Sequence, residues 1–143
     1  MAELHPASKR LHIGADEVYG DLIGRCSLCQ QRLEARDWST TDLFLDHVTA
    51  VAQLVGRRLG LRPLMWDDEF RNVADAELHR SGVGRLVDVV VWNYGPTLQL
   101  PIETWDKYLD VFDSVWVASA FKGATGSDQV LQVLISTSSE NQR

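Results

Sequence analysis

Two adjacent acidic residues, Asp16 and Glu17, follow a short apolar run and the small residues Gly14 and Ala15. At the end of a strand the backbone turns, so both carboxyl groups can reach one cavity while keeping different surroundings. One group can then stay protonated as a general acid while its neighbour stays ionised, which is the division of labour that glycoside cleavage uses. Because an Asp-Glu pair alone is more often two solvated loop residues, its context has to decide.

Polar and aromatic residues follow three further apolar runs in the same way. The groups are Trp66-Asp67-Asp68, Trp92-Asn93-Tyr94 and the segment from Ser119 to Lys122. An indole offers a large apolar face on which a sugar can pack, although tryptophans serve more often as core packing. In β/α barrels the active site lies at the C-terminal ends of the strands, so the four groups would converge on one face.

The elements that must position these groups alternate between short apolar runs and longer amphipathic stretches. This alternation is typical of β/α units around a parallel sheet. The sequence predicts strands at Arg10 to Ile13, Arg62 to Trp66, Val87 to Trp92 and Val115 to Ala120. We therefore expect an α/β fold with about four parallel strands and helices on the outside.

The predicted helices lie between these strands. One should begin near Thr41, because apolar residues recur from there at near-helical spacing. Ser39, Thr40 and Thr41 are its capping candidates, and Gly60 lies just beyond its end. Shorter helices are predicted over about Val73 to Arg80 and Ile102 to Phe112, and the stretch from Val18 to Arg36 should begin irregularly and become helical near Leu28.

Composition limits the classes of partner. The 143 residues are 45% hydrophobic and 24% charged, which indicates a soluble folded domain. A net charge of -6 without a long basic cluster argues against nucleic acid as a partner. No apolar run approaches the roughly 18 residues needed to cross a bilayer, and the first residues lack the apolar centre of a secretory signal. We expect an intracellular protein without a membrane partner.

Cys26 and Cys29 form a single C-x-x-C, the spacing of redox sites and of half a zinc site. No second pair of ligands lies at a suitable distance, so an incidental or structural role is favoured. The histidines His5, His47 and His79 share no spacing with carboxylates or cysteines that would make a metal site. We expect no metal and no cofactor.

The segment Leu11 to Glu17 resembles the strand-end signature of the family 20 glycoside hydrolases, the β-hexosaminidases, which is His, any residue, Gly, a small residue, Asp, Glu. The resemblance continues, in order and spacing, through Arg62 to Asp68, Val90 to Tyr94 and Trp116 to Gly126. It covers roughly Leu4 to Gly126 and is closer to cytosolic than to lysosomal members. It implies a partial TIM-type barrel, N-acetylhexosamine-containing glycoconjugates as substrates, and a cytoplasmic location that extends to the nucleus.

The resemblance also implies roles for the acidic pair. Glu17 matches the general acid that protonates the departing glycosidic oxygen. Asp16 matches the carboxylate that orients the 2-acetamido group of the sugar and steadies the charge developing on it. The acetamido oxygen then replaces an enzyme nucleophile, and the anomeric configuration is retained.

The other implied roles concern substrate binding. Trp66 and Trp92 resemble pocket walls that enclose the acetamido methyl group, and Tyr94 matches a donor to the acetamido carbonyl. Asp67 and Asp68 would hold sugar hydroxyls. His12 would orient the Asp16-Glu17 turn from behind the site, since a histidine in an apolar strand more often satisfies a hydrogen bond than binds a metal.

The chain departs from the family in length, because a complete β/α barrel takes about 250 residues. The resemblance begins at what would be the fourth strand and ends after the seventh, which predicts a partial barrel domain over 1–126 and a divergent tail over 127–143. We expect the chain alone to be a poor catalyst and its open sheet edges to favour self-association, for instance as a homodimer. The alternative is a non-catalytic remnant or isoform that binds sugar weakly or binds another protein.

Overall fold

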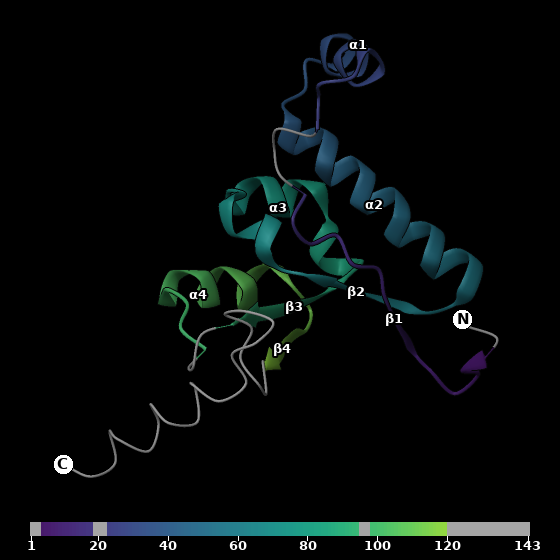
Figure 1. Cartoon of the computed structure of the whole chain (residues 1–143), viewed down its shortest axis with the longest axis vertical. Helices are drawn as coiled ribbons and strands as arrows, with labels where there is room; N and C mark the ends of the chain where they lie inside the picture. The colour runs from purple at the N-terminus through teal and green to yellow at the C-terminus, as the bar shows by residue number, and fades with distance from the viewer. Residues whose placement is uncertain (1–3, 19–22, 95–97, 120–143) are drawn as a thin grey trace, which may run out of the picture.

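The computed structural model describes residues 4–18, 23–94 and 98–119. Its sheet has four parallel strands in sequence order, β1 (Arg10–His12), β2 (Arg62–Trp66), β3 (Asp88–Asn93) and β4 (Val115–Ser119) (Figure 1). Parallel strands in sequence order with helices between them are the arrangement of part of a β/α barrel. The predicted fold class is therefore confirmed, and each predicted strand is present within one residue of its expected bounds.

The helices connect successive strands. α1 (Ser27–Arg36) and α2 (Thr40–Leu59) precede β2, α3 (Asp75–Ser81) precedes β3, and α4 (Ile102–Val111) precedes β4. Two short 3-10 helices, η2 (Asp68–Asn72) and η3 (Val83–Arg85), flank α3. These elements agree with the predicted helices, including the helix that ends at Arg36, whereas residues 19–22 of the stretch before it lie outside the described residues. In the described part of the chain, none of the helices has both the length and the apolar character needed to span a membrane.

α2 begins where the sequence predicted, because Ser39 caps it. The Ser39 side chain accepts a hydrogen bond from the Asp42 N–H at 3.1 Å, and the Asp42 carboxylate accepts one from the Ser39 N–H at 3.0 Å. This reciprocal capping box satisfies two backbone donors that a helix start otherwise leaves open. The helix ends at Gly60, whose φ of 64° lies in the left-handed region that glycine adopts without strain.

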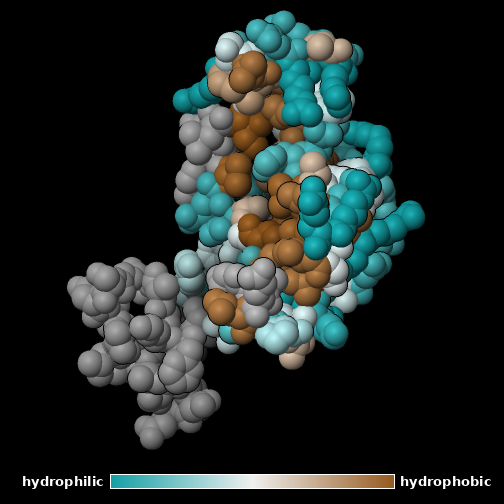
Figure 2. All heavy atoms as spheres, turned by 90° about the vertical axis from the view of Figure 1, so that its right-hand side faces the viewer, coloured by the Kyte–Doolittle hydropathy of each residue, from teal (hydrophilic) through white to brown (hydrophobic). Residues whose placement is uncertain are grey.

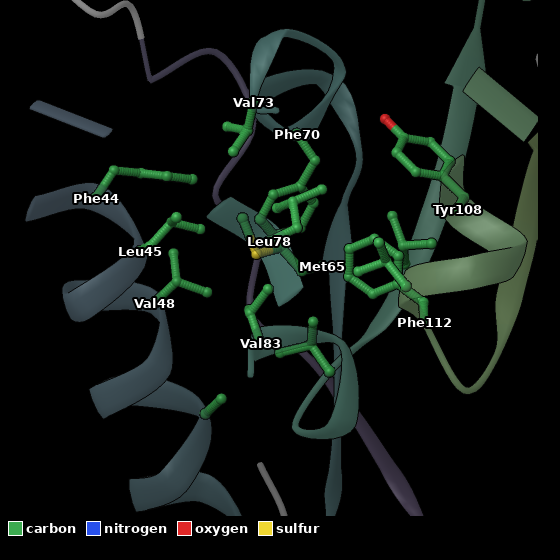
Figure 3. Close-up of a cluster of buried hydrophobic side chains, with 14 of the residues drawn as sticks. Phe44, Leu45, Val48, Met65, Phe70, Val73, Leu78, Val83, Tyr108 and Phe112 are labelled. Atoms are coloured by element: carbon green, nitrogen blue, oxygen red, sulfur yellow. The ribbon is translucent and has the colours of Figure 1, made fainter. Parts of the chain in front are cut away.

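The core lies between the sheet and the helices that cover one of its faces. Met65, Val89 and Val91 point to this face and are fully buried. Figure 3 shows side chains of α2, among them Phe44 and Val48, on one side of this cluster and Tyr108 and Phe112 on the other. α1 contributes no buried residue and lies beyond the start of α2, away from the sheet (Figure 1).

The opposite face of the sheet carries a charged cluster at the N-terminal ends of the strands. Asp88, with 2% of its surface exposed, accepts hydrogen bonds from Arg62 at 2.7 Å and Arg10 at 3.3 Å, and from the Trp116 indole at 3.3 Å. Arg62 also donates to the backbone carbonyls of Gly84, Arg85 and Val87. This buried carboxylate therefore links its own strand, β3, to the other three strands of the described sheet.

Apolar side chains are also exposed at the surface, as Figure 2 shows for the face that it presents. A groove of about 540 Å³ lies beside β1, where the end of that strand and the following loop approach α1 and α2. Its apolar lining includes Ile13, Val18, Ile23, Leu43, Phe44 and Val48. β1 and β4 are the two outer strands of the described sheet.

Candidate active site

A pocket of about 240 Å³ lies at the C-terminal ends of the four strands. Its lining residues are Asp16, Glu17, Trp66, Trp92, Asn93, Tyr94, Ala118 and Ser119. Five of the residues predicted from the sequence thus meet in one cavity, although they come from three different strand ends. This convergence follows from the parallel sheet, in which all carboxyl ends share one edge.

The loop that carries the acidic pair has an unusual backbone. Gly14, Ala15 and Glu17 have φ angles of 74°, 67° and 52°, all in the left-handed region. Only glycine adopts this region freely, so Ala15 and Glu17 each cost on the order of 1–2 kcal/mol. Such strained residues persist where the surrounding structure holds them, and they cluster at functional sites. One such hold is the Gly14 carbonyl, which accepts the Trp66 N–H at 3.1 Å.

Asp68 provides a second hold on this loop. One of its carboxylate oxygens accepts the backbone N–H of Glu17 at 2.7 Å, and the other accepts the indole N–H of Trp92 at 3.1 Å. Asp68 therefore links the acidic loop to an aromatic wall of the pocket. The sequence predicted a sugar ligand here, whereas both oxygens of this carboxylate are engaged in positioning two residues that line the pocket.

Asp67 departs more clearly from its predicted role, because it is completely buried beneath the pocket. Arg71 donates to the two carboxylate oxygens of Asp67 at 2.7 Å each. The Tyr108 hydroxyl and the backbone N–H of Trp92 also donate to this carboxylate. The sequence predicted that Asp67 would hold a sugar hydroxyl, whereas in this structure Asp67 is outside the pocket lining and its carboxylate is engaged by protein donors. Burial raises the pKa of Tyr108 far above its usual value, and the nearby Asp67 charge is the second cause of this shift. The Tyr108 hydroxyl therefore keeps its proton and stays a hydrogen-bond donor.

Arg71 extends this network to the next strand. Besides Asp67, it donates to the carbonyl of Trp92 at 2.7 Å, and its guanidinium lies 5.6 Å from the centre of the Trp92 ring. The pKa of Arg71 is raised, first because of its hydrogen bonds to Asp67. The ends of β2 and β3 are thus fixed to each other by a charge-assisted network.

His12 lies directly behind the acidic loop. Its Nδ1 accepts the Gly14 N–H at 3.0 Å, and its ring lies 4.4 Å from the ring of Trp66. Partial burial lowers the pKa of His12, and the Asp16 charge opposes this shift. The neutral ring is the form in which Nδ1 can accept a hydrogen bond. This hydrogen bond is consistent with a role in orienting the turn, although His12 is only partly covered by its neighbours and is not enclosed in the core.

The aromatic walls differ in their exposure. Trp66 and Trp92 are partly buried, which leaves apolar ring surface facing the pocket. Tyr94 is 52% exposed and lies at the rim, with its ring 4.8 Å from that of Trp92. Both acidic residues, Asp16 and Glu17, are exposed. The pocket is therefore lined by two apolar rings and two exposed carboxyl groups.

Three lining residues were absent from the predicted site, namely Asn93, Ala118 and Ser119. Asn93 and Ser119 stand within the polar groups at the ends of two predicted strands, and that placement was the signal that could have included them. The remainder of the group, up to Lys122, and the predicted tail over 127–143 lie outside the described residues. Among the residues that the structure describes, no group of three or more His, Cys, Asp or Glu side chains could hold a metal ion.

Comparison with known proteins bears on the identity of this pocket. Hexosaminidase D from Homo sapiens is 42% identical over 135 residues, which cover 92% of this chain and 27% of the human protein. Hexosaminidase D from Bos taurus is 40% identical over 137 residues, which cover 92% of this chain and 38% of the bovine protein. No protein-family model matches the chain.

The chain resembles part of hexosaminidase D. It spans between about a quarter and two-fifths of the length of these hexosaminidases. The family resemblance drawn from the strand-end motifs is thereby confirmed, and the matched length includes most of the four-stranded sheet and its pocket. These relatives suggest a glycosidase of the hexosaminidase type as the class of protein to which the pocket belongs.

Proposed function

We propose that this chain carries the acid pair of a β-N-acetylhexosaminidase that removes terminal N-acetylhexosamine from glycoconjugates by substrate-assisted, retaining hydrolysis. The observation that carries the proposal is the meeting of Asp16 and Glu17 with Trp66 and Trp92 in one pocket at the C-terminal ends of parallel strands. The resemblance to hexosaminidase D supports the same class of substrate.

In the proposed first step, Glu17 protonates the glycosidic oxygen as the bond to the anomeric carbon breaks. The carbonyl oxygen of the 2-acetamido group attacks that carbon, so the leaving alcohol is replaced by a cyclic oxazolinium ion. Asp16 accepts a hydrogen bond from the acetamido N–H and offsets the positive charge that develops there. The nucleophile belongs to the substrate, which requires the acetamido group to be held in place.

In the second step, the Glu17 carboxylate removes a proton from a water molecule that attacks the anomeric carbon. The bond from this carbon to the acetamido oxygen breaks, which opens the oxazolinium ring and restores the acetamido group. Two inversions at this carbon retain its configuration. Trp66 and Trp92 would enclose the acetamido methyl group, because an indole buries a large apolar area with few rotatable bonds. Asp68 would act as a positioning residue, since it holds both the Glu17 backbone and the Trp92 indole.

A second candidate function is sugar binding without turnover. The exposure of both carboxyl groups favours it, because water that reaches the site weakens the electrostatic interactions on which catalysis depends. The two candidates differ only in the chemical step, since both use the aromatic walls. A binding measurement and a turnover measurement on the same chain therefore separate them.

The test of turnover uses Glu17→Gln on two N-acetylhexosaminides, one with an alkyl and one with an activated aryl leaving group, and measures the released sugar. The variant should lose about 10²- to 10⁴-fold in turnover with an alkyl leaving group, which needs protonation, and much less with an activated aryl group. Asp16→Asn is the matched control, because loss of acetamido orientation should slow both substrates alike. Equal losses for Glu17→Gln on the two substrates would exclude Glu17 as the acid.

The test of binding uses a thiazoline mimic of the oxazolinium ion and the intrinsic fluorescence of the pocket tryptophans. Addition of the mimic should change the emission of the unmodified chain, and Trp66→Phe should remove most of the change. Trp38→Phe is the control, since Trp38 lies under Arg36 and away from the pocket. Binding without measurable hydrolysis would support the second candidate, and absence of both would refute the proposal.

A further inference from the structure

We propose that Cys26 and Cys29 form a redox-active dithiol, which thiol–disulfide exchange with a small disulfide such as glutathione disulfide converts to an intramolecular disulfide, with Cys26 as the attacking sulfur. The two cysteines lie at the start of α1, where Cys26 is the N-cap residue. The Cys26 sulfur accepts the backbone N–H of Cys29 at 3.3 Å. This pair lies outside the pocket and plays no part in the function proposed above.

The backbone between the two cysteines suits a disulfide. The N-cap residue has an extended backbone, with φ of -77° and ψ of 153°, and Cys29 follows three residues later in the first helical turn. The Cβ atoms of residues three apart on a helix lie about 5–6 Å from each other. A disulfide brings the two Cβ atoms to about 3.5–4.5 Å. Closing the bond therefore requires rotation of the side chains and a small adjustment of the first turn of α1.

The first turn of α1 also favours a thiolate at Cys26. It contains no acidic residue, so the partial positive charge of the helix N-terminus is not offset there. The pKa of the Cys26 thiol is lowered mainly by a hydrogen bond from the Cys29 thiol, and the Cys29 backbone N–H is the second cause. A thiolate is the attacking form in thiol–disulfide exchange, and helix N-termini are places where reactive cysteines occur.

The two sulfurs differ in accessibility, which assigns their roles. Cys26 is exposed, whereas Cys29 is partly buried. In the first step the Cys26 thiolate attacks a sulfur of the small disulfide, which forms a mixed disulfide and releases one thiolate. Cys29 then loses its proton and attacks the Cys26 sulfur, which forms the intramolecular bond and releases the second thiolate. The two cysteines are oxidised and the small disulfide is reduced to two thiols.

Neighbouring structure favours this chemistry over metal binding. A structural zinc site needs four ligands, and the described part of the chain offers no group of even three candidate ligands. α1 contributes no buried residue, so a covalent bond in its first turn need not disturb the core. The fold can therefore accommodate the reduced and the oxidised form.

The test equilibrates the 143-residue chain with mixtures of reduced and oxidised glutathione, followed by alkylation and peptide mass spectrometry. We expect a peptide containing both cysteines to lose the mass of two hydrogen atoms reversibly as the mixture becomes more oxidising. We also expect iodoacetamide to alkylate Cys26 several-fold faster than Cys29 at neutral pH. Because the pKa of Cys26 is lowered, its alkylation rate should reach its plateau at a lower pH than that of an ordinary cysteine thiol.

Two variants separate the roles. Cys29→Ser should accumulate the mixed disulfide of Cys26 with glutathione, because the resolving thiol is absent. Cys26→Ser should leave a thiol at Cys29 that reacts slowly with both reagents, and circular dichroism verifies that each variant is folded. Failure to form the intramolecular disulfide at any glutathione ratio, or faster alkylation of Cys29 than of Cys26, would overturn the proposal.

Discussion

Four carboxylates at the two ends of the sheet fall into two groups with opposite surroundings. Asp67 and Asp88 are buried, and each accepts hydrogen bonds from an arginine and from an aromatic residue. Asp16 and Glu17 are exposed at the pocket. The buried pair connects strands, whereas the exposed pair is open to a ligand. Residue type alone therefore does not distinguish a structural carboxylate from one that is available to a ligand. The hydrogen-bond donors around each carboxylate make this distinction.

Hydrogen bonds with neighbouring residues hold the loop of the acid pair in its conformation. The acidic loop has left-handed residues, which the chain would not adopt without support. Its support comes from Asp68, from the Gly14 carbonyl and from His12. Beneath it, Asp67 fixes Arg71 and Trp92. Buried polar groups with complete hydrogen bonding thus form a rigid base for a loop that is exposed.

The largest effect on stability should come from Asp67→Asn. The change leaves the Arg71 guanidinium, of which 28% is exposed, without its carboxylate partner. Breaking a buried ion pair by removing one partner costs about 3–5 kcal/mol. We expect the free energy of unfolding, measured by urea denaturation, to fall by about this amount.

The matched control is the same substitution at the exposed carboxylate. Asp16→Asn should change the free energy of unfolding by no more than about 0.5 kcal/mol, as surface substitutions usually do. It should nevertheless slow the proposed hydrolysis. If the two variants lost similar stability, the division into structural and chemical carboxylates would be incorrect.

An intermediate effect is expected for Asp42, a carboxylate whose main partner is the Ser39 cap. The pKa of Asp42 is lowered mainly by a hydrogen bond from the Ser39 side chain, and the Ser39 backbone N–H is the second cause. Because the folded-state pKa is lowered, this contribution is present above the ordinary pKa and is lost as the pH falls below it. Ser39→Ala should cost about 1 kcal/mol at neutral pH.

Urea denaturation at several pH values measures this effect. The difference in stability between Ser39→Ala and the unmodified chain should shrink as the pH falls below about 4, where Asp42 becomes protonated in the unfolded chain. Ser114 offers a control, because Ser114→Ala removes a serine outside the helix caps. A difference that stayed constant with pH would show that the Asp42 charge takes no part in the cap.

Much of the fold could be predicted from the sequence, because short apolar runs and amphipathic stretches carry a strong periodic signal. The residue at which each strand ends is not determined by this periodic signal. The prediction included Ile13 in β1, and Ile13 still donates to the Leu64 carbonyl at 2.8 Å, but Gly14 then turns into the left-handed region. A backbone angle of this kind has no periodic signature, so the strained loop could not be predicted.

The site was predicted as a group of residues but not in its detail. Trp66 faces the pocket, and alternation along a strand directs the next residue, Asp67, to the opposite face. Arg71 stands four residues after Asp67, at the spacing of an ion pair on one helical face. These two signals could have identified Asp67 as structural. The bridge from Asp68 to Glu17 joins residues far apart in the chain, and only the folded structure reveals it.

The smallest predicted effect is a gain in stability from Ala15→Gly, which tests whether the loop that carries the acid pair is strained. With a φ of 67°, Ala15 occupies a region that costs an alanine about 1–2 kcal/mol and glycine almost nothing. Glycine loses about 0.5–1 kcal/mol more backbone entropy on folding, so the net gain should be about 0.5 kcal/mol. The same change at Ala50, exposed in the middle of α2, should instead cost about 1 kcal/mol. Thermal denaturation of both variants measures the difference in sign. Destabilisation of Ala15→Gly by as much as Ala50→Gly would mean that the loop relaxes in solution, and the acid pair would then lack the fixed backbone on which the proposed chemistry depends.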